Sequence, residues 1–161
     1  MMDFEDVGLE VLIEKGFGEI VGLGSLYMLP IYIITLEFLD EKITGRVLLV
    51  ASVINSLVVH GLKIFFAVPR PSGAEEVLTY SFPSGHAATA FMVAAVLGWR
   101  YRSLRYWFIS VASLVAIGRV VIGVHFIQDV VAGALIGFLI GSLVVWKMEG
   151  LVGETGFLPE N

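Results

Sequence analysis

The sequence predicts an all-α integral membrane protein: a bundle of about five spans plus an N-terminal helix at the membrane interface. Composition is the first observation that supports this. Hydrophobic residues make up 57% of the 161 residues and charged residues 16%, and the mean hydropathy is +0.88. A water-soluble domain of this size exposes too much of its chain for such a composition. The second observation is that several apolar runs reach the roughly 20 residues that a membrane helix needs.

The predicted elements follow one another without a linker or low-complexity stretch, which indicates a single domain over residues 1–161. Residues 3–15 carry apolar side chains at helical spacing with acidic residues between them, the pattern of an amphipathic interfacial helix. Five spans follow, at about Gly18–Leu39, Val47–Val68, His86–Tyr101, Tyr106–Val124 and Phe126–Trp146. They must be helices because lipid offers backbone groups no hydrogen-bond partners. Pro30 is expected to kink the first span rather than end it.

The loops between the spans differ in charge, and this difference predicts the topology. Basic residues gather in the loops 40–46 and 100–105 and near the C-terminus. The positive-inside rule therefore places the C-terminus in the cytoplasm and the loops 69–85 and 118–125 outside a cell membrane. We expect no removable signal peptide, because the first residues are acidic and lack a cleavage site. The net charge of −5 argues against nucleic acid as a partner.

Three glycines, Gly133, Gly137 and Gly141, follow one another at intervals of four on one face of the fifth span. Such a face lets another helix approach closely. Small-residue faces serve both packing within a chain and contacts between chains. We favour packing within the chain over an oligomer formed through this face.

Two cations stand near the end of the second span. Lys63 and Arg70 are seven residues apart, about two helical turns, so they share a face if the helix continues. Pro69 and Pro71 suggest that it ends there. Both cations can then face one pocket on the outer side. Taken alone, such residues more often extend toward lipid headgroups.

The segment Pro83–His86 opens the third span. Proline and serine favour a helix start, and Gly85 lets a ligand approach the backbone closely. Free amides at a helix N-terminus form an anion site, and the imidazole of His86 could deliver a proton to a leaving oxygen there. The simpler interpretation is a helix cap by Ser84 beside a solvated histidine.

A histidine and an aspartate begin the fifth span. His125 and Asp129 are four residues apart and therefore lie on one helical face, and Arg119 precedes them at the end of the fourth span. An aspartate beside an imidazole can fix its tautomer and stabilise its charged form, as in a triad whose nucleophile is the histidine itself. The alternative is a structural hydrogen bond that closes the bundle.

The predicted topology places these three clusters on one side of the membrane. Three cations, two imidazoles, one carboxylate and a helix N-terminus at one end of a bundle predict a phosphate pocket. Carboxylates are too few for a magnesium or calcium site, and the cations would oppose a zinc ion on two histidines and an aspartate. The chain has no cysteine that could act as a thiolate ligand or nucleophile.

In order and spacing these residues resemble the signature of the type-2 phosphatidic acid phosphatase superfamily. The matching residues are Lys63, Arg70 and Pro71, then Pro83 to His86, then Arg119, His125 and Asp129. The resemblance covers roughly Val47 to Trp146 and is highly specific. One departure is Gly118, where members usually carry serine, which removes one hydroxyl contact to phosphate but no nucleophile. Many members have six spans, and the helix at 3–15 would here replace the first.

The resemblance implies a membrane enzyme that hydrolyses a lipid phosphate or pyrophosphate through a phosphohistidine, without a metal or other cofactor. It implies His125 as the nucleophile, Asp129 as the residue that orients it, and His86 as the acid and then the base. The groups that would hold the phosphate oxygens are Lys63, Arg70, Ser84, the Gly85 amide and Arg119.

The substrate is expected to be a membrane lipid, and other interpretations stay open. The outward orientation favours polyprenyl pyrophosphate, although phosphatidate and phosphatidylglycerophosphate would fit the same pocket. A lipid phosphotransferase would replace water by another acceptor. A degenerate lipid-binding protein would use the scaffold without catalysis, yet both histidines and Asp129 are present. Outside the signature, Asn55 and His60 are expected to form hydrogen bonds between helices.

Overall fold

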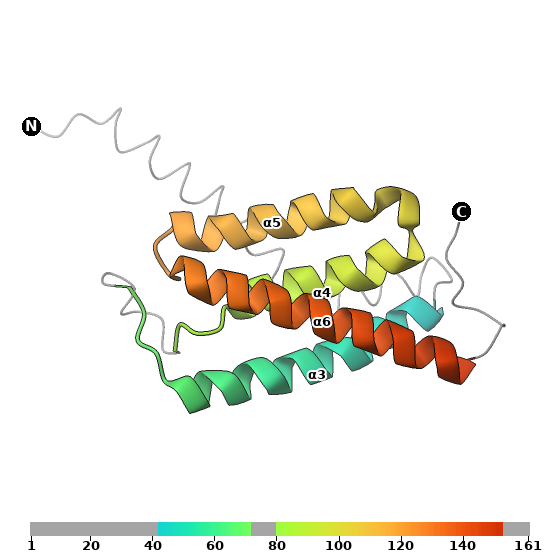
Figure 1. The fold of residues 1–161 in the computed structure, drawn as a ribbon, viewed down its shortest axis with the longest axis horizontal. Helices are drawn as coiled ribbons and strands as arrows, with labels where there is room; N and C mark the ends of the chain where they lie inside the picture. The colour runs from blue at the N-terminus through green and yellow to red at the C-terminus, as the bar shows by residue number, and fades with distance from the viewer. Residues whose placement is uncertain (1–41, 72–79, 153–161) are drawn as a thin grey trace, which may run out of the picture.

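The structure, a computed structural model, describes residues 42–71 and 80–152. Its elements are α3 (Lys42–Phe66), α4 (Gly85–Arg100), a 3-10 turn (Arg102–Leu104), α5 (Arg105–Val121) and α6 (Ile127–Val152) (Figure 1). These described residues contain helices and no strand, so the all-α prediction is confirmed. The expected interfacial helix at 3–15 and the first span with Pro30 lie outside the described residues.

Four predicted spans correspond to these helices, with shifted ends. α3 ends at Phe66 rather than Val68, and α6 continues to Val152, past the predicted end at Trp146. α4 starts at Gly85, one residue before the predicted start of the third span at His86. Apolar composition marks where a helix meets lipid, whereas backbone hydrogen bonds mark where the helix ends, and the two limits differ.

Three helical stretches are long and apolar enough to cross a membrane: Ile43–Phe66, Arg102–Val121 and Ile127–Glu149. α4, with 16 residues, is about 24 Å long and so shorter than a hydrocarbon core of about 30 Å. Three of the residues just before it, Ser81, Pro83 and Ser84, are fully buried. Non-helical backbone is tolerated at membrane depth when protein surrounds it.

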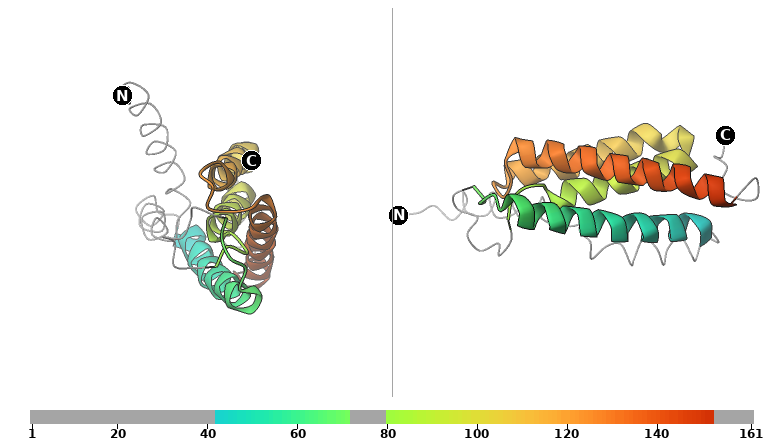
Figure 2. Two further views of the ribbon diagram at one scale, coloured as in Figure 1. Left: turned by 90° about the vertical axis from the view of Figure 1, so that its left-hand side faces the viewer. Right: turned by 60° about the horizontal axis from the view of Figure 1, so that its bottom comes forward.

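α4 lies at the centre of the described bundle. It packs against α3, α5 and α6, whereas α5 and α6 contact each other only slightly (Figure 2). The main core joins α3, α4 and α6 and consists of Val47, Leu48, Ala51, Met92, Val96, Ile140, Val144 and Val145. A smaller core of Ala87, Ala116 and Val130 joins α4, α5 and α6. The position of α4 therefore sets the positions of the other helices.

The glycine face of α6 packs on α4. A Cβ added to Gly137 would overlap the carbonyl oxygen of Ala88 in α4. Gly133 and Gly141 lie in the same way against the carbonyl oxygens of Ser84, the N-cap residue of α4, and Met92. Only residues without a side chain let two helix backbones approach so closely. The interpretation that this face packs within the chain is therefore confirmed.

Two polar residues of α3 behave differently from each other. Asn55 Nδ2 donates to Thr89 Oγ1 at 3.3 Å, which confirms the expected bond between helices. His60 Nδ1 instead lies 2.8 Å from the Ser56 carbonyl oxygen in its own helix. Within the described residues, His60 therefore bonds along its own helix, because the carbonyl one turn back is a near partner for an exposed side chain.

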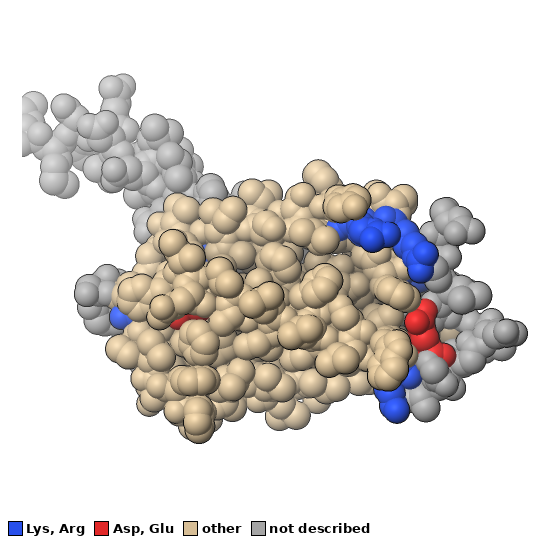
Figure 3. Space-filling model, in the orientation of Figure 1, with Lys and Arg blue, Asp and Glu red and all other residues tan. Residues whose placement is uncertain are grey.

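Charged side chains lie at the two ends of the described bundle. Lysines and arginines gather where α4 meets α5, and the middle of the visible face carries none (Figure 3). The end of α3, the start of α4 and the turn between α5 and α6 lie at the opposite end (Figure 1). The antiparallel order of α4, α5 and α6 thus separates the basic loop 100–105 from the three clusters. Which end faces the cytoplasm stays a prediction.

Candidate active site

Lys63 and Arg70 converge because the chain turns after α3. Ala67 adopts a left-handed φ of 47°, and its N–H donates to the Lys63 carbonyl oxygen at 2.9 Å, a motif that closes helices. The two cations therefore do not share one helical face. Instead, both donate to the carbonyl oxygen of Tyr80, at 2.5 Å from Lys63 Nζ and 3.4 Å from Arg70 Nη2.

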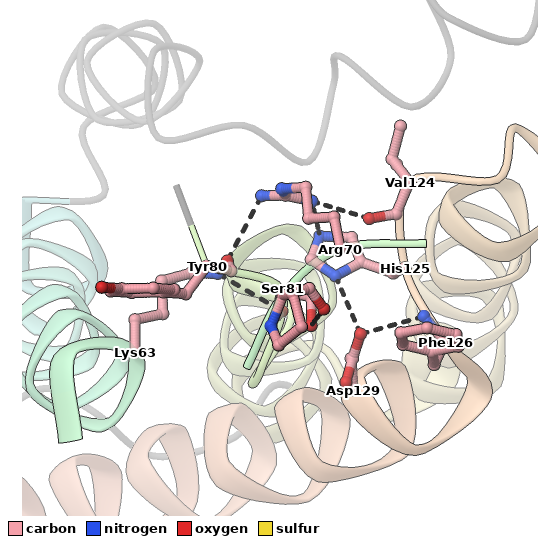
Figure 4. Close-up of polar contacts among 9 residues, drawn as sticks. Lys63, Arg70, Tyr80, Ser81, Val124, His125, Phe126 and Asp129 are labelled. Atoms are coloured by element: carbon pink, nitrogen blue, oxygen red, sulfur yellow. Dashed lines mark hydrogen bonds and ion pairs between the residues drawn. The ribbon is translucent and has the colours of Figure 1, made fainter. Parts of the chain in front are cut away.

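Lys63 does not extend toward lipid headgroups. Lys63 is only 9% exposed, and its ammonium group also lies 3.4 Å from the Ser81 carbonyl oxygen (Figure 4). A buried ammonium group needs such oxygen partners to offset its lost hydration. The backbone at Tyr80 and Ser81 thus holds this charge inside the protein.

Ser84 occupies the N-cap position of α4, yet its side chain makes no cap hydrogen bond. Its Oγ is buried and has no hydrogen-bond partner within the described part of the chain. The Ser84 N–H donates to the Asp129 carbonyl oxygen at 2.9 Å, which fixes the start of α4 against α6. A serine that caps through its side chain would bond to an amide of the first turn, so Ser84 stands at the cap position without that bond.

Asp129 both caps α6 and contacts His125. Its Oδ2 accepts the Phe126 N–H at 2.9 Å, the arrangement in which a first-turn carboxylate bonds back to the cap residue. The same oxygen lies 3.4 Å from His125 Nδ1. Asp129 is fully buried, and its Oδ1 has no partner among the described residues. The histidine–aspartate pair expected from the spacing is therefore present at the start of α6.

Arg70 determines which nitrogen of His125 carries the lone pair. Its Nη1 lies 2.7 Å from the Val124 carbonyl oxygen and 3.2 Å from His125 Nε2 (Figure 4). A guanidinium group only donates hydrogen bonds, so Nε2 is an acceptor. Nδ1 then carries the proton and points it toward Asp129. His125 thus presents an unprotonated Nε2 to the cations.

The positive side chains act on both imidazoles. His125 lies in the turn before α6, outside the membrane-spanning helices, and is 3% exposed. Burial, the largest cause, and the charges of Arg70, Lys63 and Arg119 lower its pKa to about 3. The fields of the same three cations also reach His86. His125 is therefore neutral at physiological pH, and a neutral imidazole is the nucleophilic form.

The structure brings the predicted residues together to different degrees. Lys63 and Arg70 donate to the same carbonyl oxygen, and Arg70 also contacts His125. Asp129 in turn contacts His125. Ser84 and Gly85 follow through the backbone bond to Asp129. His86 and Arg119 enter through electrostatics, and the buried Nε of Arg119 has no partner within the described ranges. No three histidine or carboxylate side chains among residues 42–71 and 80–152 could hold a metal ion together.

Sequence reasoning missed Tyr80, Ser81 and Val124, whose backbone carbonyl oxygens accept hydrogen bonds from the cations. Every residue type has a carbonyl, so no side-chain pattern marks these positions. Ser81 is different, because its side chain is also engaged. The available signal was a serine two residues before Pro83, in a segment that otherwise leads into an apolar helix.

Comparison with known proteins identifies the family. The model of the PAP2 superfamily matches residues 44–152, a range that contains every candidate site residue. The chain belongs to the PAP2 superfamily. The resemblance to the type-2 phosphatidic acid phosphatases is therefore confirmed.

Relatives within the superfamily include named lipid phosphatases. The lipid A 1-phosphatase of Porphyromonas gingivalis is 38% identical over 92 residues, which are 55% of this chain and 20% of that protein. Phosphatidylglycerophosphatase B of Bacillus subtilis is 31% identical over 136 residues, or 74% of this chain and 67% of that protein. This chain thus spans a fifth of the first relative's length and two thirds of the second's.

One solved structure is similar over most of both chains. The crystal structure of Aquifex aeolicus LpxE superposes with a TM-score of 0.75 at 34% identity, and the match covers 84% of this chain and 86% of that one. The helical arrangement around α4 is therefore shared with this solved structure.

Proposed function

We propose that this protein is a lipid phosphate phosphatase that works through a phosphohistidine on His125. The observation that carries the proposal is the pair of contacts at its ring: Arg70 Nη1 at 3.2 Å from Nε2 and Asp129 Oδ2 at 3.4 Å from Nδ1. A nucleophilic imidazole needs one unprotonated nitrogen that faces the phosphorus and a partner for the other nitrogen. Membership of the PAP2 superfamily supports the same reaction class.

The reaction proceeds in two steps. First, His125 Nε2 attacks phosphorus and the bond from phosphorus to the leaving oxygen breaks. His86, which is protonated once the bound phosphate offsets the positive charges around it, gives its proton to that oxygen. Asp129 stabilises the positive charge that develops on the nucleophilic ring. Second, neutral His86 takes a proton from water, the water oxygen attacks phosphorus, and the phosphorus–nitrogen bond breaks. Inorganic phosphate leaves, and both histidines return to their starting states.

The cations stabilise the transferring phosphoryl group. An entering phosphate accepts the Arg70 N–H that now points at Nε2, and this exchange brings phosphorus to the nucleophile. Lys63 and Arg119 neutralise charge on the remaining oxygens, and the Ser84 hydroxyl is a further donor. Backbone carbonyl oxygens already hold Lys63 and Arg70 in place, so little reorganisation accompanies the reaction. These charges take the role that a metal ion has in other phosphoryl-transfer sites.

The substrate is a membrane lipid with a phosphate or pyrophosphate group. The relatives are named for lipid A and for phosphatidylglycerophosphate, whereas the predicted outward orientation of the site favours polyprenyl pyrophosphate. All three present a terminal phosphate that the same cations can bind. Bilayer-embedded substrates suit a site at the end of membrane helices, because the lipid chain stays in the hydrocarbon.

The test is phosphate release by the purified full chain in detergent, with a substrate panel of lipid A, phosphatidylglycerophosphate, phosphatidate and polyprenyl pyrophosphate. We expect release from at least one of them, unchanged by excess chelator. Loss of activity on chelation contradicts the metal-independent scheme, and no release from any substrate contradicts the function. An added alcohol that becomes phosphorylated would instead identify a phosphotransferase.

A further inference from the structure

Ser81 lies outside the catalytic set and outside the family signature, yet all its polar groups are engaged. Its N–H donates to the Val68 carbonyl oxygen at 2.9 Å, and its Oγ donates to the Pro69 carbonyl oxygen at 3.0 Å. Its own carbonyl oxygen lies 3.4 Å from Lys63 Nζ. The residue is completely buried. One serine thus bonds both to the segment that carries Arg70 and to Lys63.

The segment that carries Arg70 depends on such outside partners. Residues 67–71 are not helical, and Pro69 and Pro71 have no N–H with which to form hydrogen bonds. The segment therefore offers mainly carbonyl oxygens as acceptors. Ser81 donates hydrogen bonds to two consecutive carbonyl oxygens, those of Val68 and Pro69. Because Arg70 directly follows Pro69, a shift of the Pro69 carbonyl also moves the guanidinium group.

The other end of this link is the start of α4. Ser81 stands three residues before Ser84, whose N–H bonds to the Asp129 carbonyl oxygen. The position of Arg70 is thereby set relative to the helix N-terminus and to the residue that orients His125. Misplacement of a phosphate-binding group by about 1 Å can cost about a hundredfold in rate.

We propose that Ser81 is a positioning residue that fixes the phosphate-binding cations Arg70 and Lys63, and this role rests on the proposed function. Ser81 contacts no substrate itself. It acts through the hydrogen bonds from its N–H and Oγ to the Arg70 segment and through the carbonyl oxygens of Tyr80 and Ser81 that hold Lys63. A serine that only stabilised the fold would leave the phosphate affinity of folded molecules unchanged.

The test compares Ser81→Ala with Ser52→Ala in the purified full chain. Ser52 is a buried serine whose Oγ donates to the Leu48 carbonyl oxygen within α3, away from the site. The readout is the inhibition constant of inorganic phosphate, which does not depend on the fraction of active protein. We expect Ser81→Ala to raise it about fivefold and to lower kcat about tenfold. Ser52→Ala should change both by less than about twofold.

Further variants separate positioning from stability. Ser81→Thr keeps the hydroxyl and should restore the phosphate inhibition constant to within about twofold of the parent. If Ser81 acts through Arg70, adding Ser81→Ala to Arg70→Ala should leave the inhibition constant of Arg70→Ala unchanged, because coupled residues are not additive. Ser81→Ala removes one hydrogen bond to the carbonyl oxygen of Pro69, an exposed residue, and is therefore expected to fold. Ser81→Cys, a weak donor, serves the same comparison should alanine fail.

An unchanged inhibition constant in folded Ser81→Ala overturns the assignment, and so does an equal rise in Ser52→Ala or an additive double variant. Failure of the proposed function gives a different result. If the parent chain hydrolyses no lipid phosphate, binding of inorganic phosphate is measured by calorimetry instead. If Ser81→Ala binds phosphate more weakly than the parent and Ser52→Ala does not, the positioning role is still supported. If Ser81→Ala binds phosphate as tightly as the parent, or if the parent binds none, the role is overturned.

Discussion

The two ends of the bundle hold cations in opposite settings. Where α4 meets α5, Arg102 lies 5.3 Å from the centre of the Trp99 ring and Arg105 lies 5.8 Å from that of Tyr106, and both arginines are exposed. At the other end, Lys63 and Arg70 donate to backbone carbonyl oxygens around His125. Exposed arginines beside aromatic rings are typical of a membrane interface.

This difference teaches that positive charge alone does not make a phosphate site. The arginines of the α4–α5 loop lie over the aromatic rings of Tyr101, Trp99 and Tyr106. The cations of the candidate site are held before a ligand arrives, and they lie around the buried His125, the proposed nucleophile. Fixed charge lowers the reorganisation that a transition state requires. The following variants test this contrast between the ends, starting with the largest expected effect.

His125→Ala should lower phosphate release by at least about a thousandfold, because it removes the atom that attacks phosphorus. His60→Ala is the matched control, since His60 is exposed on α3 and contacts Ser56 within that helix. It should keep activity within about twofold. The measurement is kcat/KM on the best substrate of the panel. Near-normal rates in His125→Ala, with a normal melting temperature, contradict its role.

Arg70→Ala should lower kcat/KM by about a hundredfold, because a donor that is fixed toward the phosphoryl group is lost. The matched change at the opposite end, Arg102→Ala, should alter it by less than about twofold. Steady-state kinetics at fixed ionic strength provide the comparison. Equal losses in both variants would mean that the overall charge of the chain, and not its arrangement, determines phosphate handling.

Acid should destabilise the folded protein through His125. Its pKa is about 3 in the folded state and about 6.5 in the unfolded state. Between these values the unfolded chain binds the extra proton, so stability falls as pH drops below about 6.5 and is unaffected by this group above that value. At about pH 5 the loss is at most about 2 kcal/mol.

The measurement is the melting temperature in phosphate-free buffer at about pH 7 and about pH 5. The parent chain should lose several degrees more than His125→Gln, which has no imidazole to protonate at this buried position. His60→Gln, a change at an exposed histidine of α3, is the matched control. Identical slopes for the parent and His125→Gln would show that this imidazole is not buried as a neutral group.

Features that depend on local periodicity could be predicted. The apolar runs indicated four of the described helices, and the four-residue interval indicated the contact between His125 and Asp129. The glycine interval likewise indicated the close contact of Gly137 with another helix. Each of these follows from helical geometry, in which residues three or four apart share a face. Helix ends were less accurate, because hydrogen bonding and not hydropathy sets them.

The sequence by itself determined the membrane class, the helical bundle and the chemical groups of the candidate site, because composition and spacing along one chain are enough for these. Only the tertiary structure decided how those groups meet. Arg70 reaches Val124 and His125 across more than 50 residues, and Lys63 meets a carbonyl oxygen that no side-chain pattern marks. Contacts between distant segments depend on how α3, α5 and α6 pack around α4, and that packing is a property of the whole fold.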